Sequence, residues 1–267
     1  MKVLSFLTAI LLTFPNLQAS QQVNASPSTN SPQATTLLRQ SLAALTGSTA
    51  LTDVTLTGSA RRIAGSAVES GTATLKALAS GAGRIDLSLP SGGRGEVTNA
   101  IVAPATGAWS GPDGISHPIP LHNLLSEPAW FFPAFAIAHR LSTTGYVATY
   151  VGHETHNGQA VEHVSVLQSS SLQMPPGIPS LTHLSQVDFF LDSTTLLPAA
   201  ITFNIHPDND MGLDIPVEIR FSGYQKAGGS LVPYHVQKYL NNGLTLDFQV
   251  QTVTVNTGLS SITFSAL

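Results

Sequence analysis

The sequence predicts an α+β domain in which a curved antiparallel sheet wraps around two helical segments. Three observations indicate this fold class: short runs that alternate apolar and polar residues, turn residues that separate these runs at regular intervals, and only two segments with helical character. Alternation with a period of two is typical of strands that bury one face. Regularly spaced turn residues also argue against a parallel α/β fold, in which helices would separate the strands.

Strand alternation is clearest in the C-terminal part of the chain. In its last run, the apolar residues from Leu244 to Val250 share one parity and alternate with polar ones. Val253 falls on the opposite parity, which predicts a β-bulge near Gln251. The five runs of this antiparallel meander are 187–192, 200–205, 217–221, 231–240 and 244–255.

Further strands are predicted upstream of this meander. Short alternating runs between residues 51 and 101 are separated by glycines. Residues 145–168 predict a hairpin that turns at Asn157-Gly158, because this dipeptide suits the type I′ turn of a two-residue loop.

The first helical segment spans residues 32–46. Ser31 precedes a proline at the first helical turn, and leucines recur at helical spacing as far as Leu45, just before Gly47. This leucine stripe is expected to cover the open face of the sheet. Binding to a membrane surface is disfavoured, because Arg39 is the only cation of the helix.

The second helical segment spans residues 121–141 and holds the most apolar stretch after the N-terminal region. Pro128 and Pro133 prevent one uninterrupted helix, so short helices are expected, and the run is shorter than a bilayer span. We interpret the segment as a helical lid over an apolar groove on the concave face, because an unclosed curved sheet needs a movable cover if it is to admit an apolar guest. Ordinary core packing is the alternative interpretation.

The N-terminal region predicts export. Residues 1–20 combine one lysine, an apolar core and a small residue near a cleavage site, which is typical of a secretory signal peptide. Residues 21–31 are polar and predict a flexible leader before a single domain at 32–267. Because the sequence has no cysteine, it offers no lipoprotein acylation site and no disulfide. We expect a periplasmic or secreted protein, and a monomer.

Several turn motifs occur in an informative order. An acid-x-x-Thr-x-x-Pro turn spans 192–198, a Tyr-x-x-x-x-Gly-x-x-x-Pro segment spans 224–233, and a Val-x-x-Asn-x-x-Leu segment spans 253–259; segments 83–87 and 150–158 fit the same order. This order resembles the outer-membrane lipoprotein-sorting superfamily, which includes the lipoprotein carrier LolA and the lipid-binding LppX-type proteins. The resemblance covers most of the chain after Pro32. It implies an unclosed half-barrel, and by analogy a carrier-like function.

The composition excludes some partners and gives no enzyme signature. The formal net charge of −4 leaves no basic surface for phosphates, so nucleic acid is not expected as a partner. No nucleophile-elbow or phosphate-binding-loop motif is present. We therefore expect no enzyme, no cofactor and no metal.

The predicted hairpin invites a metal-site interpretation, which strand geometry weakens. With a two-residue loop at Asn157-Gly158, His153 lies opposite Glu162, while the other two histidines project from the opposite face. Surface polar pairs are therefore the preferred interpretation. The polar residues of this cluster are His153, Glu154, His156, Glu162 and His163.

A second polar cluster resembles the start of a calcium loop. Asp208, Asp210 and Asp214 have suitable spacing, but Ile219 stands where the bidentate glutamate is required. A solvated acidic loop is the preferred interpretation.

Three functions compete at this level. The first is a periplasmic binding protein for the acyl chain of a lipid or lipoprotein, which could exchange its ligand with envelope membrane complexes. The second is a structural or interaction module whose core is filled, and the third is a secreted hydrolase. For the first, the residues expected to supply the mobile wall of an apolar groove are Trp130, Phe131, Phe132, Phe135 and Ile137.

Overall fold

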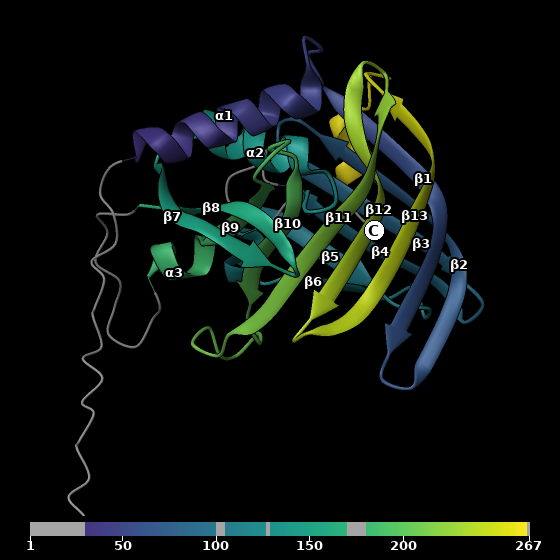
Figure 1. Ribbon diagram of the computed structural model, residues 1–267. Coiled ribbons are helices and arrows are strands. Elements are labelled where there is room, and N and C mark those ends of the chain that lie inside the picture. Colours follow the sequence, from purple (N-terminus) through teal and green to yellow (C-terminus); the bar gives the residue numbers. More distant parts are fainter. Residues whose placement is uncertain (1–29, 100–104, 127–128, 170–179, 266–267) are drawn as a thin grey trace, which may run out of the picture.

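The computed structural model describes residues 30–99, 105–126, 129–169 and 180–265, and they form one antiparallel sheet with few helices (Figure 1). The predicted signal peptide and most of the predicted leader lie outside the described residues. The strands are β1 (Asp53–Ala64), β2 (Ala67–Leu78), β3 (Ala82–Leu89), β4 (Gly92–Asn99), β5 (Thr106–Ser110), β6 (Ser116–Pro118), β7 (Tyr146–His156), β8 (Gln159–Gln168), β9 (Val187–Asp192), β10 (Pro198–Ile205), β11 (Ile215–Ala227), β12 (Ser230–Leu240) and β13 (Gly243–Val255). The helices are α1 (Pro32–Thr46), α2 (Pro133–Ser142) and α3 (Leu181–Ser185), with short 3₁₀ turns η1 (Leu121–Leu124) and η2 (Ser261–Phe264).

The sheet consists of two meanders joined at their centre. Its strand order is β6-β5-β4-β3-β2-β1-β13-β12-β11-β10-β9-β8-β7, so all strands that are consecutive in sequence lie side by side except β6 and β7, which lie at opposite edges. The pairing of β1 with β13 joins the two meanders, and β6 and β7 are the edges of a sheet that does not close. The predicted antiparallel, unclosed architecture is therefore confirmed.

The predicted β-bulge near Gln251 is confirmed. Thr57 pairs with Thr252 and the next residue, Gly58, pairs with Val250, so Gln251 has no partner opposite it on β1. Gly58 is required at this irregularity, because a Cβ there would lie 1.9 Å from the backbone oxygen of Gln249.

The β7–β8 hairpin also forms as predicted. Asn157 and Gly158 both have positive φ angles, 51° and 81°, as a type I′ turn requires. His153 lies opposite Glu162, and its Nδ1 is 2.9 Å from Glu162 Oε1.

Helix α1 packs its leucine stripe into the sheet, as expected. The Ser31 side chain caps the helix by accepting a hydrogen bond from the Ala34 amide. Leu38 and Leu45 are 1% exposed and belong to the main core, which also contains residues of α2 and of both meanders. Figure 1 shows α1 lying across one end of the sheet with α2 beside it. Within the described residues, no helix is both long and apolar enough to cross a bilayer.

The turn motifs behind the family resemblance have structural roles. Asp192 Oδ1 accepts hydrogen bonds from the backbone amides of Thr194 and Thr195, which closes the β9–β10 turn. The Tyr224 hydroxyl donates to the backbone oxygen of Pro198 at 2.8 Å, which ties two of the motifs together.

The third motif fastens the two ends of the domain to each other. Asn256 Oδ1 accepts from the Thr52 amide, and the buried carboxylate of Asp53 accepts from the amides of Thr257 and Gly258. Burial alone would raise the pKa of Asp53, but these hydrogen bonds outweigh it and hold the pKa below its ordinary value.

Candidate functional site

Two adjoining cavities form a groove on the side of the molecule where β3–β5 face the segment before α2. The first has a volume of about 350 Å³ and the second about 270 Å³. The larger cavity alone falls within the range of roughly 300–1,000 Å³ typical of small-molecule sites. We call the two cavities together the groove; the residues that line both are Glu96, Trp109, Trp130, Ile205 and Lys238.

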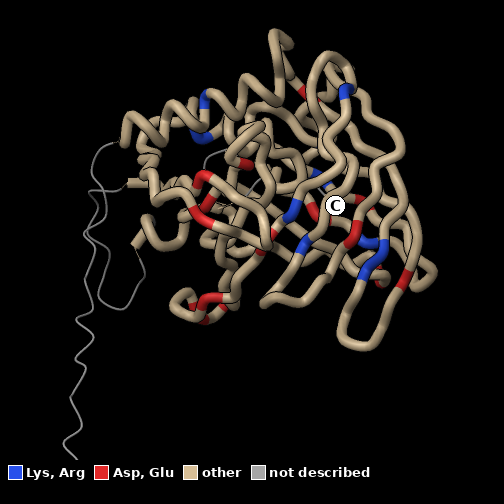
Figure 2. Tube along the Cα trace, viewed as in Figure 1, with Lys and Arg blue, Asp and Glu red and all other residues tan. Residues whose placement is uncertain are grey.

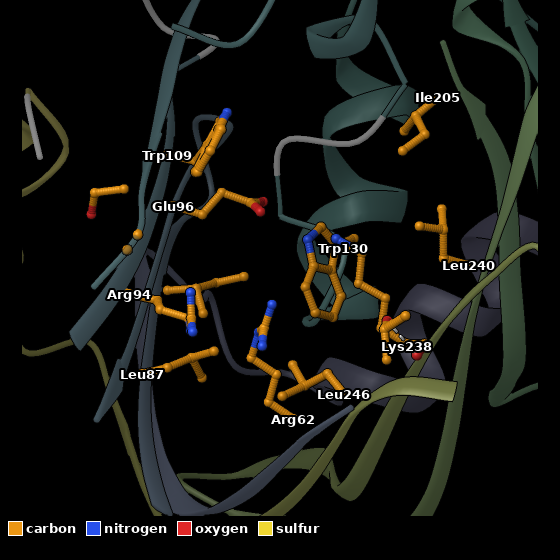
Figure 3. Close-up of a pocket in the computed structure, with 15 residues that line it drawn as sticks. Arg62, Leu87, Arg94, Glu96, Trp109, Trp130, Ile205, Lys238, Leu240 and Leu246 are labelled. Carbon is orange, nitrogen blue, oxygen red and sulfur yellow. Dashed lines mark hydrogen bonds between the residues drawn. The ribbon is translucent and has the colours of Figure 1, made fainter. Parts of the chain in front are cut away.

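Apolar side chains from both meanders form the walls of the groove. β3 contributes Ile85 and Leu87, and the opposite wall comes from Leu240 of β12 and Leu246 of β13. In the close-up, Leu87 and Leu240 lie on opposite sides of Trp130 (Figure 3), and the β1–β13 pairing joins the two meanders that carry them into one sheet. The groove can therefore surround an apolar guest between two sheet walls.

Trp109 and Trp130 lie on either side of the groove and differ in exposure. Trp109, on β5, is 47% exposed and stacks on His117 at 4.4 Å between ring centroids. Trp130 is 4% exposed, and its indole Nε1 is buried without a hydrogen-bond partner among the described residues. An indole N–H that lines a cavity is a donor available to a guest.

Three cationic side chains line the larger cavity of the groove, namely Arg62, Arg94 and Lys238. Arg62 and Arg94 lie 3.7 Å from the Glu69 carboxylate. Hydrogen bonds from Ser91, and more weakly the two guanidinium charges, lower the pKa of Glu69 despite its partial desolvation.

Lys238 differs from the two arginines. Its ammonium lies 4.6 Å from the centroid of the Trp130 ring, and it forms no ion pair with a carboxylate of the described residues. In Figure 3, Glu96 reaches toward Trp130 from one wall and Lys238 runs along its other side. Lys238 is thus a cation held at the groove by an aromatic ring rather than by an acid.

The structure places the five residues of the expected lid in two different environments. Trp130 lines the groove, as expected for a wall residue. The other four are at most 3% exposed and pack in the main core with α1 and the sheet, and none of them lines either cavity: Phe131, Phe132, Phe135 and Ile137.

The predicted polar cluster on the β7–β8 hairpin consists of separate histidine–carboxylate pairs. His156 Nε2 lies 2.9 Å from Glu218, and His163 lies 3.1 Å from both Glu154 and Asp188. His156 and His163 flank the Phe190 ring. Strand geometry separates them from His153, as expected.

A further polar cluster joins Asp214 of the predicted acidic loop to two histidines that sequence reasoning did not connect with it. His183 of α3 and His206, which follows β10, both direct Nε2 at Oδ1 of Asp214, each at 3.0 Å. His206 and Asp214 flank the last β10–β11 pair, Ile205 and Ile215, so the hairpin register was a signal for their proximity. No sequence signal pointed to His183, which is brought in by a one-turn helix.

The chain belongs to the class of proteins built on one open antiparallel sheet. Helices pack against one face of this sheet, and a groove lies beside them. The fold is similar to that of a putative outer membrane lipoprotein-sorting protein domain from Vibrio parahaemolyticus, with 12% identity, a TM-score of 0.53, and coverage of 87% of this chain and 96% of the other. A LolA superfamily protein from Nitrosomonas europaea also has a TM-score of 0.53, with 10% identity and coverage of 87% and 97%.

A DUF1329 family protein from Desulfovibrio piger is equally similar, with 12% identity, a TM-score of 0.53, and coverage of 89% and 98%. No family model matches the sequence, and no curated protein does either. At these identities the likeness establishes the fold, and the LolA-like fold expected from the turn motifs is confirmed.

Proposed function

We propose that this protein is a non-catalytic, exported binding protein of the bacterial cell envelope that holds the acyl chain of a lipid or lipoprotein in the groove. The observation that carries the proposal is the groove itself: two adjoining cavities, walled by aliphatic residues of both meanders and by two tryptophans. The LolA-like fold supports it by analogy, since one similar structure is described as a lipoprotein-sorting domain.

Burial of the acyl chain would drive binding. Each methylene removed from water contributes about 0.8 kcal/mol, so a partly inserted chain offsets the cost of association. In this proposal Trp130 contacts the chain, and Phe131, Phe132, Phe135 and Ile137 form the packed layer behind it. Because these four residues are buried, the groove wall on the side of α2 would not move to admit the ligand.

The cations give the ligand an orientation. A carboxylate or phosphate at the end of the acyl chain would meet Lys238, and Arg62 and Arg94 also line the larger cavity. Because the two arginines already share Glu69, Lys238 is the groove cation without a carboxylate partner among the described residues, and the anionic end would lie on its side of Trp130, away from Glu96. An anionic end is therefore preferred over a neutral one.

Burial of the four apolar residues behind Trp130 favours a second candidate, an envelope interaction module whose core is filled. The two candidates differ in one measurable property, which is stoichiometric binding of an acyl ligand. The test is titration with a fluorescent fatty acid, together with native mass spectrometry of protein purified from its own envelope.

A pair of variants locates the binding site. Leu87→Gln places an amide on the groove wall and should weaken fatty-acid binding, whereas Val151→Gln alters an exposed residue of β7 that lines neither cavity. Equal affinities of the two variants, or no saturable binding by the wild type, would exclude the groove as an acyl site.

A further inference from the structure

The cluster of His183, His206 and Asp214 has the donor set of a transition-metal site. Both imidazole Nε2 atoms are 3.0 Å from the same carboxylate oxygen, and the three ligand atoms all lie within 4.8 Å of one another. In a tetrahedral zinc site with bonds of about 2.1 Å, two ligand atoms lie about 3.4 Å apart. Each imidazole nitrogen would need to move only a few tenths of an ångström away from the Asp214 oxygen to reach this spacing.

The fold holds two of the three ligands in place without help from an ion. His206 is fully buried, and its backbone is clamped by Asn123, which donates to the His206 oxygen and accepts from the His206 amide, both at 2.8 Å. Asp214 lies across the base of the same hairpin, next to the terminal pair of β10 and β11. A site that is already arranged costs little reorganisation on binding.

Two buried imidazole nitrogens near the cluster lack a hydrogen-bond partner among the described residues. They are His206 Nδ1 and the Nε2 atom of neighbouring His122, and the two ring centroids are 6.0 Å apart. A neutral imidazole that carries its proton on Nδ1 leaves Nε2 as the lone-pair donor that a metal requires.

The charge of the loop also favours a cation. Asp208 and Asp210 lie between His206 and Asp214, and none of these three aspartates forms an ion pair with a lysine or arginine of the described part of the chain. Figure 2 shows the acidic residues gathered on this loop, between β10 and β11.

An ion could reach the cluster from solvent. His183 and Asp214 line a polar cavity of about 450 Å³, while His206 lines the smaller cavity of the groove. Three protein ligands beside an open cavity leave a coordination position for water.

We propose that His183, His206 and Asp214 bind one zinc ion, which fastens α3 to the β10–β11 hairpin. Two imidazole nitrogens and one carboxylate oxygen suit zinc and its neighbours in the transition series, whereas calcium and magnesium prefer oxygen ligands alone. This site shares only Asp214 with the acidic loop considered from the sequence and none of its ligands with the β7–β8 cluster, and it departs from the expectation that the chain needs no metal.

The test is isothermal titration of the untagged chain with zinc chloride after removal of metals by a chelator. We expect one zinc per chain, an increase in melting temperature on binding, and no comparable heat with calcium or magnesium. Cobalt(II) in place of zinc should give the visible absorption of a four-coordinate site.

Variants assign the ligands. His183→Ala and Asp214→Asn change partly exposed side chains, so the fold should survive, and each should weaken zinc binding by at least about 10–100-fold, the range for loss of supporting residues around metals. His153→Ala is the matched control, because it removes another imidazole paired with a carboxylate at 2.9 Å. Circular dichroism checks that each variant is folded.

Three results would overturn the proposal. They are the absence of stoichiometric zinc binding, zinc binding that folded His183→Ala retains at full affinity, and zinc binding that is lost in His153→Ala.

Discussion

Replacing Trp109 by alanine should weaken acyl binding while leaving the fold intact. Trp109 is 47% exposed, and a tryptophan side chain carries on the order of 200 Å² of surface, so about 100 Å² remains open to a guest. His117 stacks on one face of the ring, so we take about half of this area as the part that the guest covers. At about 25 cal/mol per Å², the lost contact is worth about 1 kcal/mol, or a five- to tenfold increase in Kd.

The assay is a fluorescent fatty-acid titration of Trp109→Ala beside the control Val151→Ala, which shortens an exposed residue of β7 outside the groove. Thermal melts report stability in parallel. Removing the stack on His117 costs about 0.5–1.5 kcal/mol, so only a small decrease in Tm is expected. The reasoning is refuted if Trp109→Ala binds as tightly as the control variant, or if its Tm falls as far as that of a core variant.

Three further predictions concern the buried side chain of Phe132, the buried carboxylate of Asp53 and the positive charge of Lys238. Phe132→Ala should destabilise the fold by about 3–5 kcal/mol, because the side chain is 1% exposed, and urea unfolding that shows less than about 1 kcal/mol would mean that this segment is not core. Asp53→Asn should cost about 1–3 kcal/mol near pH 7, because it weakens hydrogen bonds to a charged, buried carboxylate. Since the folded-state pKa of Asp53 lies below its unfolded value of about 3.9, this stabilisation is present above that value and is lost as the pH falls through the folded-state pKa. Urea titrations at several pH values should therefore show the two proteins converging in acid, and a gap that widens in acid would contradict the assignment. Lys238→Met should reduce the preference for a fatty acid over the matching fatty alcohol by up to about 1 kcal/mol. An unchanged preference in competition titrations would show that Lys238 does not contact the carboxylate of the ligand.

Much of the architecture could be predicted from local patterns because strand periodicity and turn chemistry are local properties. The parity change beyond Val250 predicted the bulge that the structure places at Gln251, and Asn157-Gly158 predicted both the turn and the pairing of His153 with Glu162. These predictions depend on residues a few positions apart, whose geometry the backbone fixes.

The site was harder to predict because it depends on contacts between distant segments. An apolar run such as 129–137 has the same composition whether it lines a groove or fills a core, and the structure puts Trp130 in the groove and Phe132 in the core. Trp109 was not singled out, since a lone tryptophan on a short strand carries no pattern. The cluster around Asp214 likewise required the packing of α3, which no periodicity encodes.

The central claim is that an acyl chain lies in the groove, and the two tryptophans of the sequence provide a direct test because both line it. Bromine atoms quench indole fluorescence only near contact, so a fatty acid brominated along its chain reports whether it reaches Trp109 and Trp130. We expect saturable quenching with one ligand per chain, reversed by the unbrominated fatty acid and reduced in Leu87→Gln. Quenching that does not saturate, or that Leu87→Gln leaves unchanged, would contradict the account.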